Sequence, residues 1–157
     1  MRLADFVCFE AIIAELKAAE RDGVITELIA QLDKAGRLGK GKREEITKAV
    51  IERENEASTG MGKGIAIPHV KHPAVKNMVA AIGKSTRGVD FFALDKQSVY
   101  SIILLVSPAD EPDEHLHAME SIFRHLQSQR FRKFLRQSLT AEQIKELIIE
   151  ADENPNL

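Results

Sequence analysis

The sequence predicts an α/β fold in which one mixed β-sheet is flanked by helices on both sides. Three observations support this prediction: two helical patterns near the N-terminus, a central group of short β-prone runs, and a helical last third. Residues 98–106 become apolar on both faces, which is typical of a central strand covered by helices. We expect a single domain spanning residues 1–157.

The N-terminal part is expected to contain two helices. Residues 6–17 mix apolar and acidic positions and fit either a short strand or a helix. Apolar residues at helical spacing predict a first helix over about residues 19–35, which Gly36 and Gly39 end. A second helix is expected over about residues 43–55. Its predicted inner face consists of Ile46, Ala49, Val50 and Arg53.

The centre and the last third change from strands to helices. Short β-prone runs bounded by Gly, Pro and Asp predict strands over residues 65–67, 78–82, 89–92 and 98–106. Three helices are expected over about residues 114–128, 131–137 and 141–151. The first of them would bury Leu116, Met119, Ile122, Phe123 and Leu126. Thr140 and Gln143 have the spacing of a capping box, and residues 154–157 are expected to be frayed.

Charge, hydropathy and cysteine content exclude several classes of protein. The formal net charge of −2 lacks the basic excess of a nucleic-acid binder. No apolar run approaches the roughly 18 residues of a membrane span, and the N-terminus lacks signal-peptide order. Cys8 is the one cysteine, which excludes an internal disulfide and predicts a small buried apolar residue. We therefore expect a cytoplasmic protein that binds no nucleic acid and does not insert into a membrane.

The densest chemical signal lies between residues 58 and 69. A loop with glycine at every second position leads into a short apolar run that ends in Pro68 and His69. Glycines let backbone amides approach an anion, and hydroxyls add donors. The predicted phosphate-binding residues are Ser58, Thr59, Gly60, Gly62 and Gly64. Because imidazole is suited to reversible nucleophilic work near neutral pH, we predict that His69 receives and returns a phosphoryl group.

This loop does not match a nucleotide-binding motif. A P-loop needs Ser or Thr after its lysine, whereas Lys63 is followed by Gly64. A dinucleotide fingerprint enters a helix, whereas this loop enters a β-prone run. The prediction of phosphoryl chemistry therefore depends on His69 and not on the glycines alone.

Two further side chains are candidates for the same site. Arg53 ends the second predicted helix, where its guanidinium can clamp phosphate, although an ion pair with a neighbouring glutamate is the commoner role. His115 and His117 point in roughly opposite directions on a helix, so that one of them at most faces a given site. A second imidazole there would donate a hydrogen bond to the phosphoryl group, whereas exposure to solvent is the ordinary alternative.

A metal site is the weaker interpretation of the histidines. His69, His72, His115 and His117 have spacings that invite it. No acidic or cysteine ligand is clearly placed with them, and the glycine loop would be left without a role. We therefore expect no metal and no cofactor.

Arg53-Glu54, followed by residues 58–69, closely resembles the active-site signature of enzyme IIA domains of the bacterial phosphotransferase system. The resemblance is to the fructose/mannitol class (type 2), and within it to the free-standing nitrogen-regulatory IIA proteins. Residues 91–95 and 99–108 resemble the strand pair of that family, and residues 113–116 resemble its second-histidine segment. The resemblance covers about residues 12–152 and leaves residues 153–157 as a tail.

The resemblance implies a role for each candidate. It implies that His69 is phosphorylated, on Nε2, by the phosphocarrier HPr or its nitrogen-branch paralogue. It further implies that His115 contacts the phosphoryl group and that Arg53 lies close to it. Residues 70–73, Val-Lys-His-Pro, depart from the Gly-Lys that regulatory members often carry after the histidine. The expected downstream partner is a IIB domain or a regulatory protein.

The resulting hypothesis is a phosphoryl carrier that acts mainly in regulation, because the segment after about residue 152 is too short for a IIB or IIC domain. One alternative is the IIA subunit of a fructose- or mannitol-type transporter. A second alternative, from another class, is a partner-binding module that has lost phosphotransfer.

Overall fold

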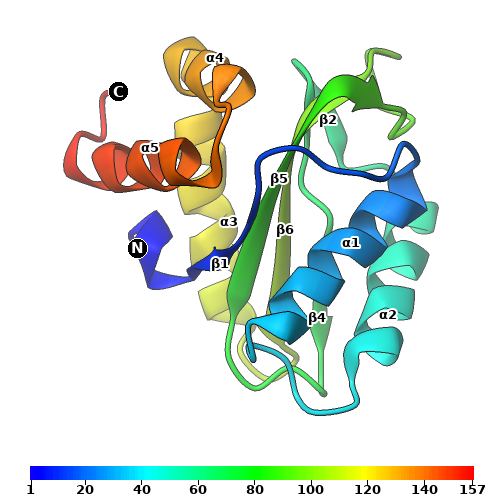
Figure 1. Ribbon diagram of the computed structural model, residues 1–157. Coiled ribbons are helices and arrows are strands. Elements are labelled where there is room, and N and C mark those ends of the chain that lie inside the picture. Colours follow the sequence, from blue (N-terminus) through cyan, green and yellow to red (C-terminus); the bar gives the residue numbers. More distant parts are fainter.

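A mixed six-stranded sheet runs through the middle of the molecule, which confirms the predicted fold class (Figure 1). The computed structural model describes all residues, 1–157. The strands are β1 (Val7–Ile13), β2 (Gly60–Gly62), β3 (Ile65–Ala66), β4 (His69–His72), β5 (Val79–Val89) and β6 (Val99–Pro108). A short 3-10 helix, η1, covers Leu3–Asp5, and the α-helices are α1 (Arg21–Lys34), α2 (Arg43–Glu56), α3 (Pro112–Leu126), α4 (Gln129–Gln137) and α5 (Ala141–Glu153).

The strand order is β1-β5-β6-β3-β2, and β4 also pairs with β6. β5 and β6 are antiparallel, whereas β1 is parallel to β5 and both β3 and β4 are parallel to β6. β3 and β4 therefore lie one after the other along the same edge of β6, separated by Ile67 and Pro68. This arrangement brings His69 beside Leu105 of the central strand.

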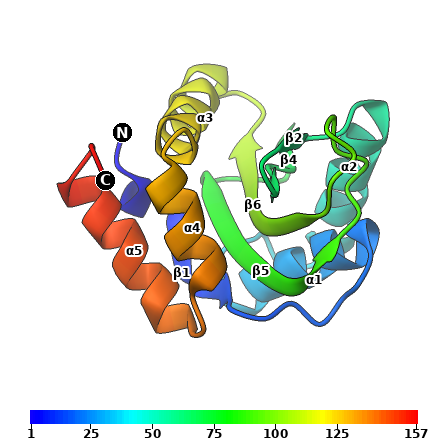
Figure 2. The same ribbon diagram turned by 90° about the horizontal axis from the view of Figure 1, so that it is seen from above.

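Two hydrophobic cores of similar size, with 21 and 20 buried residues, cover the two faces of the sheet. Figures 1 and 2 show α1 and α2 on one face and α3, α4 and α5 on the other. Alternate residues of β6 serve the two cores: Ile102 and Leu104 join the α1/α2 side, and Ile103 and Leu105 the α3–α5 side. This period of two explains why the strand reads as continuously apolar.

The helical predictions near the N-terminus are confirmed. α1 buries the residues at helical spacing, namely Val24, Ile25, Leu28, Ile29 and Leu32. α2 buries Ile46 and Val50, while Ala49 and Arg53 are half-buried. The open assignment of residues 6–17 resolves into β1, in which Cys8 is buried as predicted.

Two strand predictions are corrected, and two observed strands were not predicted. The run predicted over 78–82 continues to Val89, and residues 89–92 form no strand of their own beyond an isolated bridge from Asp90 to Glu20. β2 and β4 are absent from the prediction because they are short and lack an apolar alternation. Their strand conformation comes from pairing with β3 and β6, which local sequence does not encode.

The predicted inner face of α3 is confirmed for Ile122 and Leu126 and in part for Met119, but it is wrong for Leu116 and Phe123. Leu116 is 56% exposed and Phe123 is 36% exposed, whereas His115, Ala118 and Ser121 are buried with Ile122 and Leu126. The helix turns its polar side inward at two points because His115 meets Ser107 of β6 and Ser121 bonds the Met1 carbonyl. The exposed apolar side chains are left on the outer surface of the helix.

The C-terminal residues pack against the rest of the protein more closely than predicted. The Thr140 hydroxyl accepts a hydrogen bond from the Gln143 amide, 3.1 Å away, as the capping spacing indicates. The expected fraying of the tail is wrong for Leu157, which is 6% exposed and belongs to the α3–α5 core. None of the five α-helices combines the length and apolar character that crossing a membrane requires.

Candidate active site

His69 begins β4 and is held by a short backbone segment whose polar groups are paired. The Ile67 amide donates to the Thr59 carbonyl, and the Pro68 carbonyl accepts from the Leu105 amide 2.9 Å away. The imidazole Nδ1 lies 2.7 Å from the Ile67 carbonyl, which can only accept. Nδ1 therefore carries the proton, and Nε2 of the neutral ring keeps a free lone pair.

The surroundings of His69 favour this neutral form. Burial is the main cause of its lowered pKa, and the positive charges of Arg53 and Lys71 act in the same direction. The hydrogen bond to Ile67 and the charge of Glu54 oppose them in part. An imidazole that is neutral at pH 7, with one nitrogen committed and the other free, is a competent nucleophile at Nε2.

His115 faces the same point from the first turn of α3. Its ring centroid lies 5.5 Å from that of His69, and the residue is only 7% exposed. Burial, aided by the charges of His69 and Lys71, lowers the pKa of His115 to about 4. Its Nδ1 lies 2.7 Å from the hydroxyl of the buried Ser107. The structure thus joins two neutral imidazoles that are 46 residues apart in the sequence.

Arg53 and Glu54 reach the site from the last turn of α2. Arg53 is half-buried, and one of its amino groups donates to the Ala57 carbonyl at 3.0 Å, which leaves its other donors available. Glu54 is 2% exposed, and its two oxygens accept from the amide and hydroxyl of Thr59 at 2.6 and 2.8 Å. The charges of both residues act on His69.

Glu54 and Lys71 stand in segments that the sequence singled out, but no role was predicted for either side chain. Glu54 follows Ile46 and Val50 at successive intervals of four, which is the spacing that places it on the buried face of α2. A signal for Glu54 was therefore present. Lys71 lies two residues after His69, which puts both side chains on the same face of β4, but β4 itself was not predicted as a strand.

The hydroxyls of the glycine loop are engaged within the protein. The Ser58 hydroxyl donates to the Phe91 carbonyl and accepts from the Gly60 amide. The Thr59 hydroxyl donates to Glu54. Both residues therefore fix the loop against its neighbours, and the Thr59 carbonyl also accepts a hydrogen bond from the Ile67 amide, two residues before His69.

The glycines do not gather around His69 as expected. Residues 60–62 form β2, which pairs antiparallel with β3, so Gly62 and Gly64 sit at the turn between these strands. Ile65 pairs with Ser101 and His69 with Leu105, which separates the turn from the histidine by about 13 Å along the sheet. Of the predicted glycines, Gly60 alone lies toward the histidine end of β2.

The four histidines of the metal interpretation do not converge. His72 accepts a hydrogen bond from the Ala74 amide, and His117 is exposed beside Glu114. No group of three or more His, Cys, Asp or Glu side chains is arranged to hold a metal ion.

Comparison with a family model matches residues 6–151 to "Phosphoenolpyruvate-dependent sugar phosphotransferase system, EIIA 2". The chain is 33% identical over 144 residues to a nitrogen regulatory protein of Bradyrhizobium diazoefficiens, with 92% of each chain covered. It is 31% identical over 144 residues to a fructose-specific EIIA component of Haloferax volcanii, again covering 92% of each. A fructose-specific EIIABC component of Bacillus subtilis is 32% identical, and the chain spans 24% of its length.

Solved structures share the fold. The nitrogen regulatory protein IIA-Ntr of Neisseria meningitidis superposes with a TM-score of 0.83, covering 93% of this chain and 98% of that one at 23% identity. Enzyme IIA-mannitol of Escherichia coli, solved in complex with phosphorylated enzyme IIB-mannitol, gives a TM-score of 0.76 at 22% identity, covering 90% and 95%. At these identities the likeness concerns the fold alone.

Proposed function

Because this chain belongs to the EIIA type 2 family of the phosphoenolpyruvate-dependent sugar phosphotransferase system, we propose that it is a phosphoryl carrier that is phosphorylated on His69. The observation that carries the proposal is the 2.7 Å contact between Nδ1 of His69 and the Ile67 carbonyl. It leaves Nε2 as the nucleophilic nitrogen. The donor is a phosphohistidine protein of the HPr type.

In the proposed step, the Nε2 lone pair of His69 attacks the phosphorus atom of the donor phosphohistidine. A new N–P bond forms while the donor's N–P bond breaks and its electron pair returns to the donor imidazole. The charge in transfer lies on the phosphoryl oxygens, so that fixed donors aimed at them stabilise the transition state. The free Arg53 donors and His115 are the groups suited to this role.

His115 can donate from Nε2 when its Nδ1 accepts a hydrogen bond from the Ser107 hydroxyl. The neutral imidazole then carries its proton on Nε2 and can donate to a phosphoryl oxygen. Ser107 is fully buried, which fixes this contact and the orientation of the ring. Thr59 and Gly60 support the loop beside the site, and Glu54 holds Thr59 in place.

The outer face of α3 supplies an apolar surface next to the phosphoryl site. Leu116 directly follows His115 and is 56% exposed, and Phe123 lies two turns further along. Apolar side chains rimmed by charge are typical of surfaces that meet other proteins. We propose that the HPr-type donor and the downstream acceptor dock here in turn.

The acceptor decides between a regulatory role and sugar transport. The nitrogen regulatory and fructose-specific relatives are similarly related, at 33% and 31% identity. We propose a mainly regulatory role, with a IIA component of a fructose-type transporter as the second candidate. Transfer of the phosphoryl group from His69 to a purified IIB domain at a catalytic rate favours the transport role.

The first experiment incubates the protein with phosphoenolpyruvate, enzyme I and HPr, or with their nitrogen-branch counterparts, and measures intact mass at mildly alkaline pH. We expect an acid-labile gain of one phosphoryl group (~80 Da). His69→Ala is expected to abolish the gain. His72→Ala serves as the matched control and is expected to be phosphorylated normally, since its Nδ1 only accepts from the Ala74 amide.

A folded protein that gains no mass with either set of donors contradicts the proposal and supports a partner-binding module. Phosphorylation that persists in His69→Ala contradicts the assignment of the nucleophile.

A further inference from the structure

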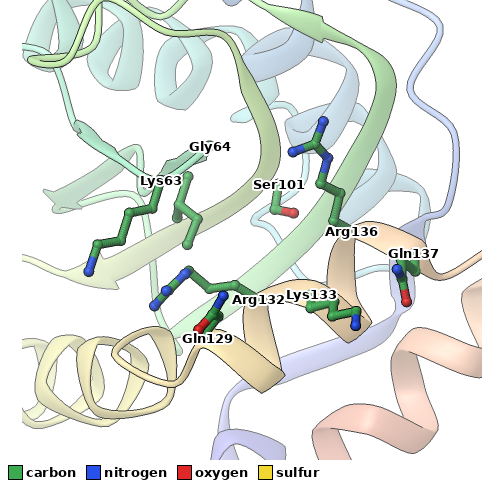
Figure 3. A pocket seen from close by; sticks show the side chains of 9 residues that line it. Lys63, Gly64, Ser101, Gln129, Arg132, Lys133, Arg136 and Gln137 are labelled. Atoms are coloured by element: carbon green, nitrogen blue, oxygen red, sulfur yellow. The ribbon is translucent and has the colours of Figure 1, made fainter.

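A cationic cavity lies between the β2–β3 turn, the start of β6 and α4 (Figure 3). Its volume is about 520 Å³, within the range of small-molecule sites. Four cationic side chains line it: Lys63, Arg132, Lys133 and Arg136. The other polar lining residues are Ser101, Gln129 and Gln137, and no carboxylate takes part. A chain with net charge −2 thus concentrates positive charge in one hollow.

The cations reach the cavity from two distant parts of the sequence. Lys63 occupies the turn between β2 and β3, and the other three lie on one side of α4 at intervals of one, three and four residues. None of the four makes an ion pair with a carboxylate in the folded protein, so their charges remain available to a ligand.

Two of these cations are positioned by contacts within the protein. The Arg136 guanidinium stacks on the Tyr100 ring, 3.6 Å from its centroid. One Arg132 amino group donates to the Leu126 carbonyl, which ends α3. Guanidinium groups held in this way keep donors free for phosphate or carboxylate oxygens and lose less freedom when a ligand binds.

Ser101 adds a neutral hydroxyl to the cavity. The residue as a whole is 3% exposed and lines the cavity. Its hydroxyl makes no hydrogen bond within the protein and is open to the cavity, since no buried polar side-chain atom lacks a partner. Gln129 and Gln137 add amide donors at the two ends of α4. The cavity therefore offers neutral donors together with four positive charges.

We propose that this cavity binds a small anion that carries two or more phosphate groups. Four cations exceed what a single phosphate dianion neutralises, and they match an anion with three or four negative charges. Only one hydrophobic residue lines the cavity and no lining residue is aromatic, so the lining offers no aromatic ring on which a base could stack. The phosphates, and not a base or an apolar group, would supply the recognition.

This site is separate from the phosphoryl site. Ser101 and His69 lie at different ends of the β6 edge, about 13 Å apart along the strands by register. The β2–β3 turn that presents Lys63 leads through Ile65–Ala66 to Pro68 and His69. A bound polyanion would therefore fix the turn that precedes the phosphorylated histidine.

Isothermal titration calorimetry of the unphosphorylated protein at 150 mM salt tests the proposal, with inorganic tripolyphosphate as the probe. We expect saturable one-to-one binding, tighter than that of orthophosphate. Lys133→Gln should weaken the affinity about fivefold or more, because one of four cations is lost. Arg130→Gln is the matched control on the same helix. Its side chain lies over Phe134 and not in the cavity, so the affinity should not change.

Ser101→Ala separates a ligand-binding role from a structural one. Because the hydroxyl has no partner in the free protein, its removal should leave the free energy of unfolding unchanged or slightly higher while tripolyphosphate binds severalfold more weakly. Pyrophosphate and ADP form two further arms. Equal affinity for pyrophosphate and ADP would indicate that the cavity recognises the phosphate groups and makes no contact with the nucleoside.

Several results overturn the proposal. One is the absence of saturable tripolyphosphate binding. Another is equal weakening of the affinity by Lys133→Gln and Arg130→Gln. A third is loss of binding in Arg53→Gln but not in Lys133→Gln. The last result would place the probe at the phosphoryl site. Tighter binding of a short single-stranded RNA than of tripolyphosphate also contradicts it. None of these measurements requires phosphorylation of His69, so the two proposals fail separately.

Discussion

At the scale of single residues, the two imidazoles of the site are kept neutral in different ways. His69 is half-buried and donates through Nδ1 to a carbonyl, whereas His115 is deeply buried against a hydroxyl. The lowered pKa of each ring means that the unfolded chain takes up protons more readily than the folded one as the pH falls. The burial that keeps both rings neutral therefore also makes the stability of the protein sensitive to acid.

His115 is one source of the pH dependence of stability, beside His69 and His125, whose pKa values burial also lowers. The pKa of His115 is about 4 in the folded protein, whereas its usual value is 6.5. Above pH 6.5 the imidazole is therefore mostly neutral in both the folded and the unfolded state, and it does not change the free energy of unfolding. Between pH 6.5 and 4 the unfolded state gains the proton first, and stability falls. Discounted for partial solvation, the loss from pH 7 to pH 5 is on the order of 1–2 kcal/mol. Urea unfolding at the two pH values measures it.

His115→Gln should reduce that loss, because the titrating group is gone. His117→Gln is the matched control, since His117 lies on the exposed side of the same helix turn and its replacement should keep the wild-type difference. An identical pH dependence in wild type and His115→Gln would contradict this account of the buried ring.

Glu54 is the buried charge on which the glycine loop depends. In Glu54→Gln, one amide oxygen must serve the two Thr59 donors that two carboxylate oxygens now accept. We expect a loss of about 2 kcal/mol in the free energy of unfolding, the usual size for charge-assisted hydrogen bonds. The pKa of His69 should fall further, because the Glu54 charge now raises it. Denaturant unfolding and histidine NMR titration measure the two effects.

Glu52→Gln, two residues earlier and exposed, is the control for Glu54→Gln and should change neither quantity. A Glu54→Gln protein as stable as the wild type would indicate that the carboxylate does not hold Thr59.

At the scale of elements, the pairing of β2 with β3 depends on the absence of a side chain at Gly60. A Cβ atom there would lie 2.8 Å from the Cβ and 2.9 Å from the Cα of Ala93, so backbone would have to move. The Gly60 carbonyl also accepts from the Leu94 amide. β2 is therefore fixed against the loop of residues 90–95, and through Thr59 against His69.

Gly60→Ala is expected to cost about 1–3 kcal/mol of stability, as overpacking usually does. It should also slow phosphorylation of His69, because the displaced strand carries the Thr59 carbonyl that pairs with Ile67. Thermal unfolding and the mass-based phosphorylation time course measure these effects.

Gly39→Ala is the control for Gly60→Ala, since its added Cβ would meet only the flexible Lys42 side chain within 3.4 Å. Equal behaviour of the two alanine variants would contradict a tight approach at Gly60.

At the scale of the whole molecule, β6 joins the two cores into one unit. Leu104 and Leu105 are both fully buried, and they face the α1/α2 core and the α3–α5 core respectively. If β6 detached from the sheet, each core would lose buried side chains that pack in it. The two halves of the protein are therefore expected to unfold together.

Leu104→Ala and Leu105→Ala should each lower the free energy of unfolding by about 2–5 kcal/mol, the usual cost of a buried Leu-to-Ala change. Calorimetric and van't Hoff enthalpies should agree in the wild type and in both variants. A second transition in one variant, with the other core still folded, would contradict a shared unit.

Much of the local structure could be predicted from the sequence. The apolar period of α1, the apolar run of β6 and the cap at Thr140 are short-range patterns whose meaning does not depend on the partner. His69 could be singled out because its loop and its position after Pro68 are contiguous in the chain.

Other features depended on partners that are distant in the sequence. Leu116 was predicted to be buried but is exposed, whereas exposure was the ordinary expectation for its neighbour His115, which is buried. The His115 ring is held inside by its hydrogen bond with Ser107 of β6. Gly62 and Gly64 read as part of the phosphate site and lie at the far turn, because β2 pairs with β3. An apolar pattern predicts the buried face of a helix only to within about one residue, so it cannot tell whether Leu116 or His115 is buried.

The α/β fold class and the choice of His69, after a glycine-rich segment, as the candidate nucleophile both came from the sequence, because periodicity and local motifs are properties of neighbouring residues. Tertiary structure alone decided that His69 meets His115, that Glu54 holds Thr59, and that Lys63 joins three cations of α4 around one cavity. These groups are 5 to 73 residues apart in the chain. They meet because strand pairing and helix packing, which lower the free energy of the whole chain, fix their positions together.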